Sequence, residues 1–247
     1  MSKMIVIDGL DGSGKATQAE ILTDYLKSRG YETYTLDLPF YNDPSSTLVK
    51  MYLGGELGEN PGDVNAYAAS TFYAVDRYAS FKKHWEKEYL SDKIIVANRY
   101  TTSNACHQMT KLPKEKWDEY LEWLFEFEYE KMGIPKPDGV IFLDMPTDIS
   151  QKLLLKRYKG DENKKDVHEK AVDYLVACHE AAVYAAEKLG WCRIICGKDG
   201  EPLSVDEISK LVELEAERML LREWRGDNAP MHRHWKANDR HLRPAAR

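Results

Sequence analysis

Short apolar runs alternate along the chain with longer stretches in which apolar residues recur every three or four positions. Five of the short runs predict strands: Met4 to Asp8, Thr33 to Leu38, Ile94 to Asn98, Val140 to Asp144 and Arg193 to Cys196. Four of them are mostly apolar, as is typical of strands covered on both faces of a parallel sheet. The second alternates polar and apolar residues, which favours a position near the sheet edge.

Three of the intervening stretches predict amphipathic helices. Residues 16–29 have helical periodicity and stop at Gly30, a residue typical of helix ends. A second helix carries a predicted buried stripe at spacings of four and three: Tyr67, Thr71, Ala74, Tyr78, Phe81 and Trp85. A third, Lys164 to Leu189, carries a stripe of the same kind. This alternation predicts a three-layer, doubly wound α/β domain, in which ligands bind beyond the carboxyl ends of the strands.

Composition and charge narrow the class of protein. The chain has 247 residues, of which 43% are hydrophobic and 31% charged, with a formal net charge of −6. These proportions exclude disordered and collagen-like chains. The net negative charge also differs from the excess of Lys and Arg that is typical of a nucleic-acid-binding protein. No apolar run reaches the roughly 18 residues of a membrane span, and no signal-peptide layout precedes the first strand. We therefore expect a cytoplasmic protein that binds neither nucleic acid nor a membrane.

The chain is long enough for one large domain and a short extension. We expect residues 1–220 to form the domain and residues 221–247 to be flexible. Residues 226–247 contain five Lys or Arg without periodicity, so a mobile extension and a basic arm for a partner both remain open. Four scattered cysteines are predicted to be reduced, structural thiols: Cys106, Cys178, Cys192 and Cys196.

A phosphate-binding loop follows the first predicted strand. Gly9 to Lys15 reads GxxxxGK, in which glycines let backbone N–H groups face phosphate oxygens and the lysine adds a mobile charge. The next position normally carries a hydroxyl for Mg²⁺ but is Ala16 here, and Thr17 is the nearest substitute. The residues expected to bind ATP phosphates are Gly9, Asp11, Gly12, Ser13, Gly14, Lys15, Ala16 and Thr17.

Cations elsewhere in the chain indicate a second bound group. Tyr73 and Arg77 are four residues apart on one helix face, which suits a stacked nucleobase with a guanidinium at its carbonyl, or else a surface cation–π pair. Arg99 ends a buried strand, where it could clamp a second phosphate or pair with a carboxylate. A cluster of lysines and Arg157 surrounds Gly160 and Asp161. It is either a solvated face or a lid over the donor phosphates, which we place at residues 152–168.

Taken together, these motifs resemble the thymidylate kinases, a family of P-loop nucleoside-monophosphate kinases. The matching segments keep the family's order and spacing over residues 1 to 215: IDGLDGSGKATQ (7–18), LPFYNDPSS (38–46), TFYAVDR (71–77), NRYTTSNACHQ (98–108) and IFLDMP (141–146). The resemblance implies a five-stranded parallel sheet of the P-loop NTPase type. It also implies ATP with Mg²⁺ as donor, dTMP as acceptor, and a homodimer.

The resemblance also implies roles for individual residues. Arg99 would hold the acceptor phosphate, Tyr73 would stack on the base, Arg77 would reach its carbonyl, and Asp11 would accept from the sugar 3′-hydroxyl. The full set expected to bind dTMP is Asp11, Phe40, Tyr41, Tyr73, Arg77, Arg99, Ser103, Asn104 and His107. Catalysis is assigned to Lys15, Arg99 and a lid cation, with Arg157 first and Lys156 and Lys165 next.

The chain also departs from the family pattern. Asn98 stands where the family usually has Asp, so Thr17 and Asn98 are only weak candidates for holding metal. The LPFY segment at residues 38–41 lacks the family's phosphate-binding Arg, and His107 replaces a Tyr near the sugar 2′-carbon.

These residues lead to one main functional hypothesis, transfer of the γ-phosphoryl group of ATP to dTMP or a related deoxypyrimidine monophosphate, giving dTDP and ADP. The chemistry needs positioning and charge but no general base, because the attacking phosphate oxygen is already anionic. A deoxynucleoside kinase, with Asp8 as base, is one alternative. A nucleotide-binding module with weak catalysis is the other, because Ala16 and Asn98 remove polar groups.

Overall fold

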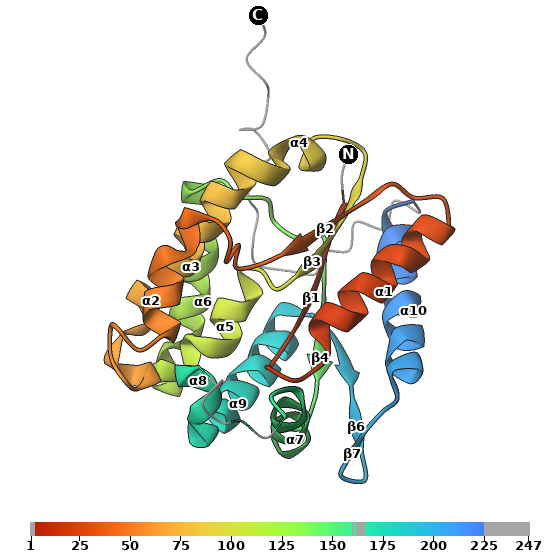
Figure 1. The fold of residues 1–247 in the computed structure, drawn as a ribbon. Coiled ribbons are helices and arrows are strands. Elements are labelled where there is room, and N and C mark those ends of the chain that lie inside the picture. The colour runs from red at the N-terminus through yellow and green to blue at the C-terminus, as the bar shows by residue number, and fades with distance from the viewer. Residues whose placement is uncertain (1–2, 160, 162–165, 225–247) are drawn as a thin grey trace, which may run out of the picture.

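A computed structural model describes residues 3–159, 161 and 166–224 (Figure 1). Its main sheet has five parallel strands in the order β2-β3-β1-β4-β5. The strands are β1 Lys3–Gly9, β2 Thr33–Asp37, β3 Ile94–Asn98, β4 Gly139–Asp144 and β5 Cys192–Ile195. The five-stranded parallel sheet is confirmed, and β2 lies at an edge, as its alternating pattern predicts.

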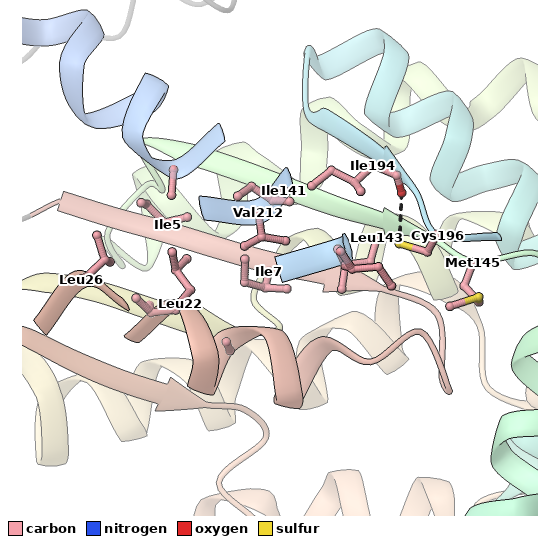
Figure 2. Packing of buried hydrophobic residues seen from close by; sticks show 14 of the residues in the cluster. Ile5, Ile7, Leu22, Leu26, Ile141, Leu143, Met145, Ile194, Cys196 and Val212 are labelled. Atoms are coloured by element: carbon pink, nitrogen blue, oxygen red, sulfur yellow. Dashed lines mark hydrogen bonds between the residues drawn. The ribbon is translucent and has the colours of Figure 1, made fainter. Parts of the chain in front are cut away.

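Helices cover both faces of the sheet (Figure 1). On one face, α1 Lys15–Ser28 and α10 Val205–Trp224 pack on Ile5, Ile7 and Ile141 (Figure 2). On the other lie α3 Ala66–Ser80, α5 Thr102–His107 and α9 Val172–Leu189, with α6 Trp117–Phe125 packed against α5 and α9. Burial of apolar surface on both faces explains why the three central strands, β1, β3 and β4, are largely apolar.

Shorter elements connect these layers. The helices are α2 Thr47–Leu53, α4 Glu86–Tyr89, α7 Thr147–Arg157 and α8 Val167–Lys170. Two π-helical turns, Phe81–Trp85 and Glu126–Lys131, extend α3 and α6. Four 3₁₀ turns are Pro44–Ser46, Pro61–Asp63, Met109–Lys111 and Lys114–Lys116, and β6 Gly197–Lys198 pairs with β7 Glu201–Pro202.

Two helix predictions need correction. Tyr78, predicted to be buried, is 41% exposed, and Arg77 is buried in its place because a carboxylate inside the protein neutralises it. The predicted helix from 164 to 189 is instead α8 and α9, separated at Ala171, which has a non-helical ψ of 84°. Asp166 starts α8 with a capping box, so helix begins anew there. Residues 164–165 lie outside the described residues.

The register of the strands gathers their carboxyl ends at one edge of the sheet. Asn98 pairs with Ile7 of β1 on one side and with Asp37 of β2 on the other. The loop after β1 therefore lies beside the ends of β2 and β3, where the motifs predict ligands.

Three further expectations concern the end of the domain, the cysteines and membrane-spanning helices. Helix α10 runs through residue 224, beyond the predicted domain end at 220, and residues 225–247 lie outside the described part of the chain. None of the four cysteines forms a disulfide bond. Across the described ranges, no helix combines the length and apolarity that crossing a membrane requires.

Candidate active site

The loop between β1 and α1 has the backbone geometry of a phosphate cradle. Gly12 and Gly14 have φ values of 82° and 86°, in the left-handed region that favours glycine. A Cβ atom on Gly12 would lie 2.6 Å from the Ser150 carbonyl oxygen, so α7 packs directly on the loop. Gly14 also precedes the first turn of α1, where unpaired N–H groups and the helix dipole attract an anion.

Lys15 lies buried at the centre of this loop. Its ammonium group donates to the Leu10 carbonyl over 2.7 Å and lies 3.7 Å from the Asp11 carboxylate. Burial, assisted by the positive charge of Arg99, lowers the pKa of Lys15 to about 8. Such a lysine gains most from a phosphate, which would restore its preference for the charged form.

Arg99 is held beside the same loop. Its φ is 67°, a conformation that residues other than glycine rarely adopt, and its N–H donates to the Ile7 carbonyl over 3.1 Å. Its guanidinium pairs with Asp11. Burial opposes ionisation of Asp11, but Arg99 and Lys15 outweigh it and hold the pKa of Asp11 well below its usual range. The carboxylate pairing that the sequence left open is therefore present, and it aims Arg99 at the loop.

Arg77 is not part of a surface pair. Its Nε and Nη2 atoms donate to the two oxygens of Glu128 over 2.6 and 2.5 Å, and both side chains are buried. Thr101 and Asn104 donate to the same carboxylate over 2.9 and 3.3 Å. Glu128 thus fixes Arg77 and Asn104, two residues expected at the base, in one buried network.

Tyr73 and the segment after β2 line the same site as Arg99. Tyr73 packs edge-on against Tyr52, with ring centroids 6.5 Å apart. Asp76 accepts from the Phe40 N–H over 2.9 Å and from the Ser45 hydroxyl over 2.6 Å, which anchors this segment to α3. Phe40 itself stacks on His84, at a centroid distance of 5.0 Å.

At the end of β1, both carboxylate oxygens of Asp8 accept hydrogen bonds from neighbouring residues. It is buried and accepts from the Gly9 N–H over 2.8 Å and from the Ser103 hydroxyl over 2.9 Å, with Thr102 as a third donor. Both oxygens of this carboxylate are taken by donors within the protein, and Asp8 does not line the cavity described below. The geometry therefore does not favour Asp8 as a general base. The Ser103 hydroxyl, expected to bind dTMP, instead donates its hydrogen bond to Asp8.

One cavity of about 760 Å³ joins these parts. The expected residues that line it are Asp11, Gly12, Gly14, Lys15, Ala16, Tyr41, Tyr73, Arg77, Asn98, Arg99, Ser103, Asn104, His107 and Arg157. Five expected residues within the described ranges lie outside its lining: Gly9, Ser13, Thr17, Phe40 and Lys156. Lys165 and Lys164 fall outside the described residues. A volume of this order accommodates two small polar ligands or one large one.

The cavity lining has further polar residues: sequence reasoning placed His107 near the sugar but missed Gln108 and His168. His107 and Gln108 are buried in its lining, and none of their side-chain nitrogen or oxygen atoms has a hydrogen-bond partner of good geometry within the described structure. Burial lowers the pKa of His107 to about 4, so it is neutral at pH 7. His168 stacks on His107 at 5.8 Å and pairs with the Tyr52 hydroxyl over 2.7 Å. Neutral, unpaired groups here suit a polar but uncharged part of a ligand.

A glycine loop with a buried lysine and, beside it, an arginine in a left-handed backbone conformation line one cavity on a five-stranded parallel sheet, and this defines a P-loop phosphotransferase. A family model described as thymidylate kinase matches residues 7–204. This chain belongs to the thymidylate kinase family.

Individual relatives agree with this assignment. The chain is 27% identical over 204 residues to a thymidylate kinase of Mycobacterium tuberculosis, covering 81% of this chain and 93% of that protein. It is 28% identical over 193 residues to a probable thymidylate kinase of Thermococcus onnurineus, covering 77% and 87%. In fold it resembles the solved thymidylate kinase of Candida albicans, with a TM-score of 0.61 at 18% identity over 88% of this chain and 93% of that one. The family resemblance and fold class predicted from the motifs are confirmed.

Proposed function

We propose that this chain transfers the γ-phosphoryl group of ATP to dTMP, or to a related deoxypyrimidine monophosphate, giving dTDP and ADP. The observation that carries the proposal is the placement of Lys15 and Arg99 on one cavity, each beside Asp11. ATP phosphates would lie on the glycine loop and Lys15, and the acceptor phosphate would lie against Arg99.

Catalysis in this proposal rests on charge and position. Lys15 of α1, Arg99 just after β3 and Arg157 of α7 line the cavity, so they can neutralise charge that spreads over the transferred group. The acceptor phosphate attacks in line and carries its own negative charge, so no general base is required. The saturated hydrogen bonding of Asp8 supports this route over phosphorylation of a neutral nucleoside hydroxyl.

The base of the acceptor would lie between Tyr73 and the Arg77–Asn104 side of the cavity. Among the described residues, the Nη1 atom of Arg77 donates only to the Tyr100 carbonyl, over 3.4 Å, so it is the guanidinium nitrogen best placed for a base carbonyl. Tyr73 supplies an aromatic face, and Asn104 an amide anchored by Glu128. Tyr41 and His107 would then line the sugar side.

The residues at the strand ends fit Mg²⁺ as the companion of ATP. The Oδ1 atom of Asn98 is buried and has no hydrogen-bond partner in the described structure, and an amide oxygen is a ligand that Mg²⁺ accepts. Asn98 and Ala16 both line the cavity, whereas Thr17 is exposed outside it. When bound, the metal would screen the phosphate oxygens; Asn98 would orient it or its water.

A panel of acceptors tests the proposed reaction. ADP release with ATP and Mg²⁺ is measured for dTMP, dUMP, dCMP, UMP and the nucleoside thymidine. We expect the highest kcat/KM for dTMP or another deoxypyrimidine monophosphate. Thymidine as the preferred acceptor would instead support a nucleoside kinase, and ATP and dTMP binding without turnover would support a binding module.

Assembly and location are further parts of the proposal. We propose a homodimer in the cytoplasm, where ATP and nucleotides are available. Val75 and Tyr78 leave an apolar face of α3 exposed at 41% each, which suits a contact with a second copy. Light scattering after size exclusion should give twice the 28.5 kDa chain mass, and Tyr78→Glu should give the monomer mass.

A further inference from the structure

At one corner of the cavity, two positions lack the metal-binding groups that their motifs usually carry. Ala16 carries no hydroxyl and Asn98 carries no charge. Together with Asp37 they are the three residues that line both the main cavity and a second cavity of about 400 Å³ between α1 and β2. The described residues contain no group of three or more His, Cys, Asp and Glu side chains that could hold a metal alone. A metal here would therefore come with nucleotide phosphates and use few protein ligands.

The other carboxylates of the main cavity are already engaged. Asp11 pairs with Arg99 and Lys15, and both oxygens of Asp76 accept hydrogen bonds from the segment after β2. Asp166 and Glu169 cap each other's backbone at the start of α8. Asp37, the remaining acidic residue of this lining, is solvent-exposed.

The sheet register places Asp37 directly beside Asn98. The two residues are partners at the carboxyl ends of β2 and β3, and the Asn98 amide donates to Asp37 Oδ1 over 2.6 Å. This bond uses the amide nitrogen and leaves two oxygens: the second oxygen of Asp37, and the buried Oδ1 of Asn98, which has no partner in the described ranges. Carboxylate and amide oxygens are the ligands that Mg²⁺ prefers.

We propose that Asp37 supplies the negative charge of the Mg²⁺ site, with Asn98 as the residue that positions it. The carboxylate that position 98 lacks would thus be provided one strand further toward the sheet edge. Asp37 would hold the metal or one of its waters at the nucleotide phosphates. This inference rests on the proposed use of ATP with Mg²⁺, and it adds a residue that the sequence motifs do not contain.

Metal affinity tests the inference without turnover. Binding of Mn²⁺, as a spectroscopic substitute for Mg²⁺, is measured by electron paramagnetic resonance on the full chain with a non-hydrolysable ATP analogue. Asp37→Asn should weaken Mn²⁺ binding about 10-fold, as for residues that hold a metal or its ligands. The matched control is Asp24→Asn, which removes one charge from the wall of the second cavity, at a 72% exposed side chain that pairs with Lys27.

Exchanging the residues at positions 37 and 98 tests whether the metal needs a carboxylate at position 37 itself or a carboxylate–amide pair at this contact. Asp37→Asn combined with Asn98→Asp restores a carboxylate–amide pair at the same contact, so Mn²⁺ affinity should recover most of the loss. Asn98→Asp alone would set two carboxylates at the 2.6 Å contact and should not raise the affinity. Unchanged affinity in Asp37→Asn, an equal loss in Asp24→Asn, or tighter binding in Asn98→Asp alone would overturn the inference.

The two measurements, dTMP phosphorylation and Mn²⁺ affinity, distinguish a failure of the proposed function from a failure of this inference. If dTMP accepts no phosphoryl group while Asp37→Asn still weakens Mn²⁺ binding in the analogue complex, the metal site stands and the acceptor assignment falls. If dTMP is phosphorylated while Asp37→Asn leaves Mn²⁺ affinity unchanged, the acceptor assignment stands and the proposed role of Asp37 in the metal site falls.

Discussion

The buried ion pair between Arg77 and Glu128 makes a quantitative prediction about stability. Arg77 is 3% exposed and Glu128 is fully buried, and two hydrogen bonds join them. Burial opposes the charge on Arg77, and Glu128 more than compensates, so that the pKa of Arg77 is raised. Each charge is therefore stable inside the protein only while the other is present.

The expected magnitudes follow from what each change leaves behind. Arg77→Met leaves the Glu128 charge with only the Thr101 and Asn104 donors, and should lower the free energy of unfolding by about 4 kcal/mol. Glu128→Gln keeps the shape but leaves Arg77 unpaired, and should cost about 3 kcal/mol. The double variant has no buried charge, so its loss should be smaller than the sum by about 2 kcal/mol or more.

Urea unfolding followed by circular dichroism measures these values, and m-values check that the transition stays two-state. The dTMP KM of each variant that folds reports separately on the base site. Single losses below about 1 kcal/mol, or losses that add within about 0.5 kcal/mol, would refute the account of a mutually dependent buried pair.

Three further predictions concern the phosphate side of the cavity. His107 has its pKa lowered by burial to about 4 from an ordinary 6.5, so the unfolded chain takes up a proton first as pH falls. Stability should be fully present above about pH 6.5 and fall by up to about 3 kcal/mol on going to pH 4; His107→Phe should flatten this slope in urea titrations, and an unchanged slope would count against it. Lys15 has its pKa lowered to about 8, mainly by burial, so ATP binding at pH 8 should take up a proton. Calorimetry in buffers of different ionisation enthalpy detects this uptake, and its persistence in Lys15→Met would disprove the assignment. Arg99→Met should lower kcat with dTMP about 10²–10³-fold while ATP still binds, and a parallel loss of ATP binding in calorimetry would contradict a role at the acceptor phosphate.

Much of the fold could be predicted because its signals are local. Strands buried on both faces have uninterrupted apolar runs, so β1, β3 and β4 stand out from any amphipathic helix. The phosphate loop is one continuous segment, so its pattern of glycines and lysine can be read without knowing any distant partner. Its position after β1 then defines where the ligand cavity must lie.

The misassigned positions depend on partners that are distant in the sequence. The spacing of apolar residues placed Tyr78 in the core and left Arg77 either at a bound base or in a surface pair. Glu128, 51 residues away, reverses that assignment by neutralising Arg77, and nothing near residue 128 indicates it. Asp37 was missed for a similar reason, because only the strand register sets it against Asn98.

The π-helical turn at Phe81–Trp85 determines how this region tolerates changes in length. A π turn holds one residue more than the α-helix it interrupts, so removing one residue there would return the chain to ordinary helical winding. Tyr73 and Arg77 lie before the turn and would keep their direction. A deletion earlier in α3 would instead rotate them by about 100° relative to the sheet. Natural insertions and deletions along this helix should therefore concentrate between residues 81 and 85.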